Sequence, residues 1–104
     1  MNESDWKVFK KIKEKALEKY CLDAMADFSE IIKNEKSGAH DRYLEFYQLV
    51  RKRDKELGKI FDGHSRSKAT MQLLLIRMEG LVDEELLQKL SDEFLQDTDP
   101  KRLT

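Results

Sequence analysis

The sequence predicts an all-α fold, a small four-helix bundle-like domain with a long N-terminal helix and a buried third helix. Helix-breaking residues are rare, with one proline and four glycines in 104 residues, whereas residues that favour helices are plentiful. Apolar residues recur at spacings of three and four, as on one face of a helix. The length suits a single helical domain over residues 1–104 with a small core of its own.

The first predicted helix begins at Ser4, as its N-cap, and runs to about Ile32. Its apolar stripe is about 40 Å long, which is more than a bundle of this size needs. We therefore expect either that the helix bends near its middle or that one end projects and finds a second copy of the chain. Val8 and Leu22 lie off the stripe and are candidates for that contact, with ordinary surface exposure as the alternative. The stripe consists of Trp6, Phe9, Ile12, Ala16, Leu17, Tyr20, Ala24, Phe28 and Ile31.

A turn at Asn34–Gly38 leads to a second predicted helix, Asp41–Phe61. Asp54 falls within its apolar side, and a carboxylate that faces a core needs a cation or hydrogen-bond donors. Gly58, on the same side, predicts the close approach of another backbone, that of the third helix. The apolar side consists of Tyr43, Phe46, Tyr47, Val50, Leu57 and Phe61.

The third predicted helix, Lys68–Glu79, is apolar on almost every side, which predicts that other helices surround it. Gly63 and Gly80 are suited to left-handed positions at the ends of the second and third helices. A short fourth helix, Glu84–Leu95, follows with Asp83 as its N-cap. Residues 97–104 are polar and are predicted to form a frayed tail.

Composition indicates a soluble cytoplasmic protein with no membrane segment. Twenty basic and twenty-one acidic residues nearly cancel, so the overall charge does not favour nucleic acid as a partner. Cys21 is the only cysteine, which excludes a disulfide within the chain. The longest uninterrupted apolar run, Leu73–Ile76, is far too short to cross a bilayer.

The most distinctive polar feature is the basic segment Arg51–Lys68, which holds seven basic and three acidic residues. Serine hydroxyls, cations and free N–H groups at the start of a helix can bind a phosphate or a carboxylate. The alternative is a plain helix cap in which Arg66 or Lys68 neutralises Asp54 or a carboxylate of the fourth helix. The candidate contact residues are Arg51, Arg53, Asp54, His64, Ser65, Arg66 and Lys68.

Other chemistry has little support. His40 and His64 are 24 residues apart, about 36 Å along a continuous helix, so we predict no metal site and no cofactor. Cys21 has no nearby histidine or arginine in the sequence, and it is expected to be a half-buried structural thiol. A helix-turn-helix around Gly80 is rejected because its DNA-recognition helix would be Glu84–Leu95, which is acidic and would be repelled by phosphates. We therefore expect no enzymatic activity.

These observations favour a non-enzymatic helical protein–protein interaction module, a homodimer that associates through the first helix. In this hypothesis the basic residues Arg51, Arg53, Arg66 and Lys68 contact an acidic protein partner. The alternative hypothesis is a binder of a phosphate-containing ligand or of nucleic acid through Arg51–Lys68.

Overall fold

The computed structural model describes residues 1–103, and every secondary-structure element in that range is helical. The prediction of an all-α fold with a long N-terminal helix is therefore confirmed. The elements are the α-helices α1 (Glu3–Lys33), α2 (Ala39–Phe61), α3 (Arg66–Met78), α4 (Glu84–Leu87) and α5 (Asp92–Asp97), and the 3-10 helix η1 (Pro100–Leu103).

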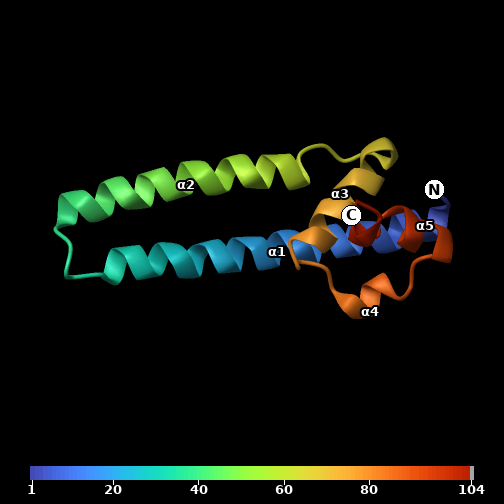
Figure 1. The fold of residues 1–104 in the computed structure, drawn as a ribbon, viewed down its shortest axis with the longest axis horizontal. Helices are drawn as coiled ribbons and strands as arrows, with labels where there is room; N and C mark the ends of the chain where they lie inside the picture. The colour runs from blue at the N-terminus through green and yellow to red at the C-terminus, as the bar shows by residue number, and fades with distance from the viewer. Residues whose placement is uncertain (104) are drawn as a thin grey trace.

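The two long helices α1 and α2 form an antiparallel hairpin, and the shorter helices gather at the end of it that holds the N-terminus (Figure 1). The molecule measures 53 × 27 × 23 Å. The hairpin's turn therefore projects away from the rest of the fold. We call residues 21–57 the distal part of the hairpin, because this segment runs out to the turn and back.

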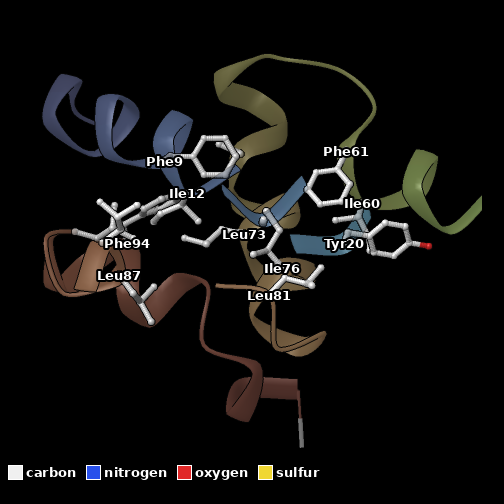
Figure 2. Close-up of a cluster of buried hydrophobic side chains, with 14 residues drawn as sticks. Phe9, Ile12, Tyr20, Ile60, Phe61, Leu73, Ile76, Leu81, Leu87 and Phe94 are labelled. Carbon is white, nitrogen blue, oxygen red and sulfur yellow. The ribbon is translucent and has the colours of Figure 1, made fainter. Parts of the chain in front are cut away.

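The hydrophobic core lies at the opposite end, where the first half of α1 meets the end of α2, α3 and the C-terminal segments (Figure 2). Phe9 of α1 and Phe94 of α5 meet edge to face, with ring centroids 6.5 Å apart. The buried apolar residues are Phe9, Ile12, Ala16, Tyr20, Ile60, Phe61, Ala69, Leu73, Ile76, Leu81, Leu86, Leu87, Leu90 and Phe94.

Helix α1 follows most of the predicted stripe, since Phe9, Ile12, Ala16, Tyr20 and Ala24 are all buried, whereas Leu17 is exposed. The helix is one continuous element, and its second half projects from the core beside α2 (Figure 1). That the projecting end meets a second copy stays a prediction. The helix also begins earlier than predicted. Its N-cap is Asn2 and not Ser4, and the Asn2 side chain accepts a hydrogen bond from the backbone N–H of Asp5 at 2.7 Å.

Helix α2 is rotated relative to the prediction. Asp54 is exposed, so the expectation of a core-facing carboxylate is wrong. Tyr43 and Tyr47 are also exposed, because over most of its length α2 has only α1 to pack against and buries a narrow face. The expectation for Gly58 is wrong as well. A Cβ at Gly58 would meet the Asp62 side chain at 3.0 Å, and not the backbone of a neighbouring helix.

Helix α3 is buried on one face only, so the expectation that other helices surround it is wrong. Ala69, Leu73 and Ile76 are fully buried, but Met71 and Met78 are 60% and 52% exposed. The reason is that few elements are available to pack on its outer side. The chain after α3 forms only short helices, and α4 packs on α1 rather than on the outer side of α3.

The predicted helix Glu84–Leu95 is divided into α4 and α5 by Ser91, which caps α5 by accepting a hydrogen bond from Phe94 N–H at 3.3 Å. Ser91 also donates from its backbone N–H and from Oγ to the carboxylate of Asp5, at 2.8 and 2.6 Å. This second pair of bonds holds the start of α5 against the start of α1.

The segment predicted to be a frayed tail is folded as far as it is described. Thr98 is fully buried, and η1 follows it. The guanidinium of Arg77 donates to the Leu95 carbonyl at 2.7 Å and to Thr98 Oγ1 at 2.9 Å, which ties this segment to α3. The last residue of the predicted tail, 104, lies outside the described residues.

Candidate functional site

The distal part of the hairpin carries an apolar groove between α1 and α2. Three adjoining hollows of about 180, 340 and 250 Å³ make up the groove, and neighbouring hollows share Phe28 or Phe46 as a wall. We call this surface the distal groove. Its apolar lining includes Cys21, Met25, Phe28 and Ile32 from α1, and Tyr43, Phe46, Val50 and Leu57 from α2.

Sequence spacing explains why α1 has this second apolar face. Cys21, Met25, Phe28 and Ile32 are separated by four, three and four residues, so they share one side of the helix. At 100° per residue, that side is about a third of a turn away from the stripe that enters the core. Helix α1 therefore contributes apolar side chains to two surfaces: its first half to the core and its second half to the distal groove.

The floor of the groove is aromatic and its rims are exposed. Phe28 and Phe46 meet edge to face across the hairpin, with ring centroids 5.3 Å apart and an interplanar angle of 81°. Met25, Ile32 and Tyr43 stand around them with 63%, 55% and 65% of their surfaces exposed. Single exposed apolar side chains are ordinary, but an aligned set of them along a groove is typical of a contact surface.

Arg53, one of the predicted contact residues, holds the hairpin together at the inner end of the groove. Its guanidinium forms an ion pair with Asp27 and lies over the ring of Tyr20, 5.5 Å from the centroid. The Tyr20 hydroxyl lies 2.9 Å from the Arg53 carbonyl and 3.1 Å from the Glu56 carboxylate, and its single proton is shared between these two acceptors. Burial raises the pKa of Tyr20 above its ordinary value.

Two other predicted residues lie nearby. Arg51 stacks over the ring of Tyr47 at 5.8 Å. Asp54 lines the inner end of the groove, and within residues 1–103 the structure gives its carboxylate no ion pair. At the turn end of the groove, Lys33 and Arg42 line the hollows. The turn end of the groove is thus lined by basic side chains, whereas the inner end holds both Arg53 and the carboxylate of Asp54.

His64 and Arg66 lie beyond the end of α2, and they cover Trp6. The His64 ring is 5.1 Å from the indole, and the Arg66 guanidinium is 5.5 Å from it on the ring face. Arg66 also forms an ion pair with Glu3. The hydrogen bond that the Arg66 guanidinium donates to the Glu3 carboxylate is the main cause of the lowered pKa of Glu3. Both residues therefore have structural partners on α1.

Ser65 and Lys68 are the last two predicted residues. Ser65 occupies the N-cap position of α3 without a side-chain capping bond, and its Oγ lies 3.1 Å from Ser67 Oγ. Lys68 lies beside Lys13, whose ammonium donates to the Gly63 carbonyl at 2.6 Å. Burial and the charge of Lys68 lower the pKa of Lys13. The seven predicted residues thus divide into two groups, one on α2 and the other in the α2–α3 connection and the first turn of α3.

The sequence interpretation missed the distal groove as a surface. The available signal was the four-three-four spacing of Cys21, Met25, Phe28 and Ile32, of which only Phe28 belongs to the predicted core stripe. Of the two residues suggested for a subunit contact, Val8 is partly buried against the core and Leu22 is 60% exposed outside the groove.

Within residues 1–103, no group of three or more histidine, cysteine, aspartate or glutamate side chains is arranged to hold a metal ion. None of the helices in that range combines the length and apolar character that crossing a bilayer requires. No family model matches the chain, and no curated protein or solved structure matches it significantly.

Proposed function

We propose that this protein is a non-enzymatic helical interaction module that self-associates, and that the distal groove is its contact surface. The observation that carries the proposal is the uncovered apolar groove in a hairpin that projects from the core. The proposal keeps the homodimer expected from the sequence, but it moves the contact from the first helix alone to both helices of the hairpin.

The exposed area supports this proposal. The chain exposes 7397 Å², whereas a compact monomer of 12.3 kDa exposes about 6,100 Å². The difference of about 1,300 Å² exceeds the roughly 800 Å² that each partner buries in a standard protein interface. The radius of gyration, 16.7 Å, is likewise larger than the value of about 13 Å for a compact chain of this length.

A second copy is the partner that this geometry favours. Two hairpins placed groove to groove form a four-helix arrangement in which each apolar face covers the other. A twofold contact of this kind is closed, since it uses the same surface on both copies and leaves none exposed for further growth. The exposed Tyr43 and Met25 would become central contacts, and aromatic and methionine side chains are enriched in interfaces.

The structure gives less support to the alternative, binding of a phosphate-containing ligand or nucleic acid through Arg51–Lys68. The charges of that segment do not converge on one place. Arg53 pairs with Asp27 and Arg66 pairs with Glu3, while Arg51 lies over Tyr47. The distal groove, in contrast, is a continuous surface that residues 1–103 leave uncovered.

Light scattering after size-exclusion chromatography tests the proposal. We expect the wild-type chain to approach twice its mass of 12.3 kDa as protein concentration rises. Met25→Glu places a charge in the groove and should remain at the monomer mass. Leu22→Glu is the matched control, because Leu22 is on α1 and equally exposed but lies outside the groove. Its mass should follow that of the wild type.

Cys21 provides a second measurement, because it is the only thiol in the chain and lines the groove. If the groove is covered in the dimer, Cys21 should react with a thiol reagent more slowly as protein concentration rises. A wild-type mass of one chain at every concentration would refute the proposal. Dissociation by Leu22→Glu but not by Met25→Glu would show that the contact lies elsewhere on α1.

A further inference from the structure

Two lysine side chains from different helices come together beside Gly63, in the connection between α2 and α3. The ammonium of Lys13 donates to the Gly63 carbonyl at 2.6 Å, and the same carbonyl accepts from Gln72 Nε2 at 3.0 Å. Lys68 lies across the α-carbon of Gly63, since a Cβ there would be 2.5 Å from its Nζ. His64 Nδ1 is 3.5 Å from Lys13 Nζ. We call Lys13, His64 and Lys68 the junction cluster.

The positive charge of the junction cluster has no carboxylate close enough to neutralise it. Among the residues that the structure describes, neither Lys13 nor Lys68 has an ion pair. The charge of Asp62 acts on Lys13, but the Asp62 carboxylate leans towards α2, because a Cβ at Gly58 would be 3.0 Å from its Oδ2. Burial and the charge of Lys68 lower the pKa of Lys13 in spite of Asp62. The fold thus holds two mutually repelling ammonium groups beside one residue.

An anion that contacts both ammonium groups would remove this repulsion. A phosphate group suits the cluster better than a single carboxylate, because near neutral pH it carries close to two negative charges and offers at least three acceptor oxygens. Lysine binds phosphate as a point charge, without the fixed geometry that an arginine contact needs. His64 and Lys68 are exposed and Lys13 is partly exposed, so a small ligand can reach all three side chains.

Only part of the basic segment predicted from the sequence belongs to this cluster. Arg53 and Arg66 are paired with carboxylates of α1, and Arg51 lies over Tyr47. Lys13, which supplies the second ammonium group, comes from α1 and was not among the predicted contact residues. The cluster also lies outside the distal groove, so this inference does not depend on self-association.

We propose that the junction cluster binds a phosphate group, with Lys13 and Lys68 as its two charge contacts and His64 as a third polar contact. The ligand is inorganic phosphate or the terminal group of a phosphomonoester, because both present the same oxygens to the lysines. Since the contacts come from α1, the α2–α3 connection and α3, the bound phosphate joins these segments and stabilises the folded chain by mass action.

A titration with inorganic phosphate, followed by NMR of the full-length 15N-labelled chain at constant pH and ionic strength, tests the proposal. We expect the amide signals of Gly63 and His64 to shift and to saturate with one Kd. Lys13→Gln and Lys68→Gln each remove a charge contact, so each should raise that Kd by about 10-fold or more. Lys11→Gln is the matched control, because Lys11 is exposed on another side of α1, and its Kd should equal that of the wild type.

Circular dichroism confirms that each variant is helical before its Kd is compared. If the wild-type shifts grow without saturating, or if Lys11→Gln weakens binding as much as Lys68→Gln does, only general charge attraction is present and the proposal is overturned. Glycerol 2-phosphate then distinguishes the two sources of the group. A Kd similar to that of inorganic phosphate assigns the site to phosphomonoesters as well, whereas no saturation restricts it to free phosphate.

Thermal unfolding provides a second measurement. Phosphate stabilises folded proteins in general, because it is excluded from their surfaces. The variant that carries both Lys13→Gln and Lys68→Gln therefore supplies the baseline, and added phosphate should raise the Tm of the wild-type chain by more than that of this variant. Equal rises in Tm would overturn the phosphate site. The self-association test with Met25→Glu would be unaffected, because that substitution lies in the distal groove.

Discussion

Asp5 and Ser91 are joined by two hydrogen bonds across 86 positions of the sequence. The carboxylate of Asp5 is almost fully buried, and it accepts from both the backbone N–H and the Oγ of Ser91. A buried carboxylate is stable only if donors compensate for the water that it loses. The pair therefore fixes the first turn of α1 against the start of α5.

We predict that Asp5→Ala lowers the free energy of unfolding by about 1–3 kcal/mol, because it leaves the Ser91 donors without their acceptor. Urea unfolding followed by circular dichroism measures the change, with all variants compared at one protein concentration. Asp23→Ala, on an exposed position of the same helix, is the control and should change stability by no more than about 0.5 kcal/mol. Equal effects of the two substitutions would contradict a structural role for Asp5.

The folded state of the segment after α5 leads to a second prediction. Thr98→Ala removes a buried hydroxyl that accepts from Arg77 and donates to the Phe94 carbonyl at 2.7 Å. We expect a loss of about 1–2 kcal/mol in the free energy of unfolding. Hydrogen exchange offers a direct check, since the Thr98 amide, bonded to Phe94, should be protected. If the Thr98 amide exchanged rapidly and Thr98→Ala left the free energy of unfolding unchanged, this segment would be frayed, as the sequence predicted.

Gly63 and Gly80 both have positive φ angles, of 84° and 69°, and they differ in the space around them. A Cβ at Gly63 would lie 2.5 Å from Lys68 Nζ, whereas a Cβ at Gly80 would have no neighbour within 4 Å. Left-handed backbone costs a non-glycine residue about 1–2 kcal/mol. Gly80→Ala should therefore lower the free energy of unfolding by about that amount.

Gly63→Ala should lower it only slightly further, because the atoms that must move are the flexible end of the Lys68 side chain. Thermal unfolding of the two variants side by side measures the difference. If Gly80→Ala proved the more damaging, crowding by Lys68 would have no measurable effect.

Asp83 makes stability depend on pH. Its carboxylate accepts from the backbone N–H of Leu86 at 3.0 Å and from Lys15 at 3.1 Å, and these bonds hold its pKa below the ordinary value of 3.8. Because the folded-state pKa is the lower one, the stabilisation is complete above about pH 4 and disappears as the pH falls through the folded-state value.

The wild-type chain should therefore be more stable than Asp83→Asn at about pH 7, and the difference should shrink as the pH falls below about 4. Chemical unfolding at a series of pH values measures both. Asp23→Asn, on an exposed carboxylate, serves as the control. A difference that is independent of pH would mean that the charge of Asp83 has no part in the effect.

The parts of the fold that depend on local spacing were predictable. Phe9, Ile12, Ala16 and Tyr20 follow one another at helical intervals, and they are buried as expected. The left-handed glycines and the capping role of Asp83 also depend only on neighbouring residues, and each was found where it was predicted.

The parts that depend on distant packing were not predictable. Whether Asp54 faces a core is decided by how many helices cover α2, and only α1 does so along most of its length. The outer face of α3 also carries apolar side chains, so the sequence alone could not show that Met71 and Met78 would remain exposed. The Asp5–Ser91 contact has no local signal because it joins the two ends of the chain.

The division of α1 between two surfaces has a consequence for the order in which the chain can fold during synthesis. Ribosomes release a chain from its N-terminus, so the second half of α1 can pair with α2 once residue 61 has emerged. The first half must wait much longer, because Phe9 packs against Phe94 and Asp5 is held by Ser91. The earliest residues to be made are thus among the last to be buried, and the hairpin that carries the distal groove can form before the core is complete.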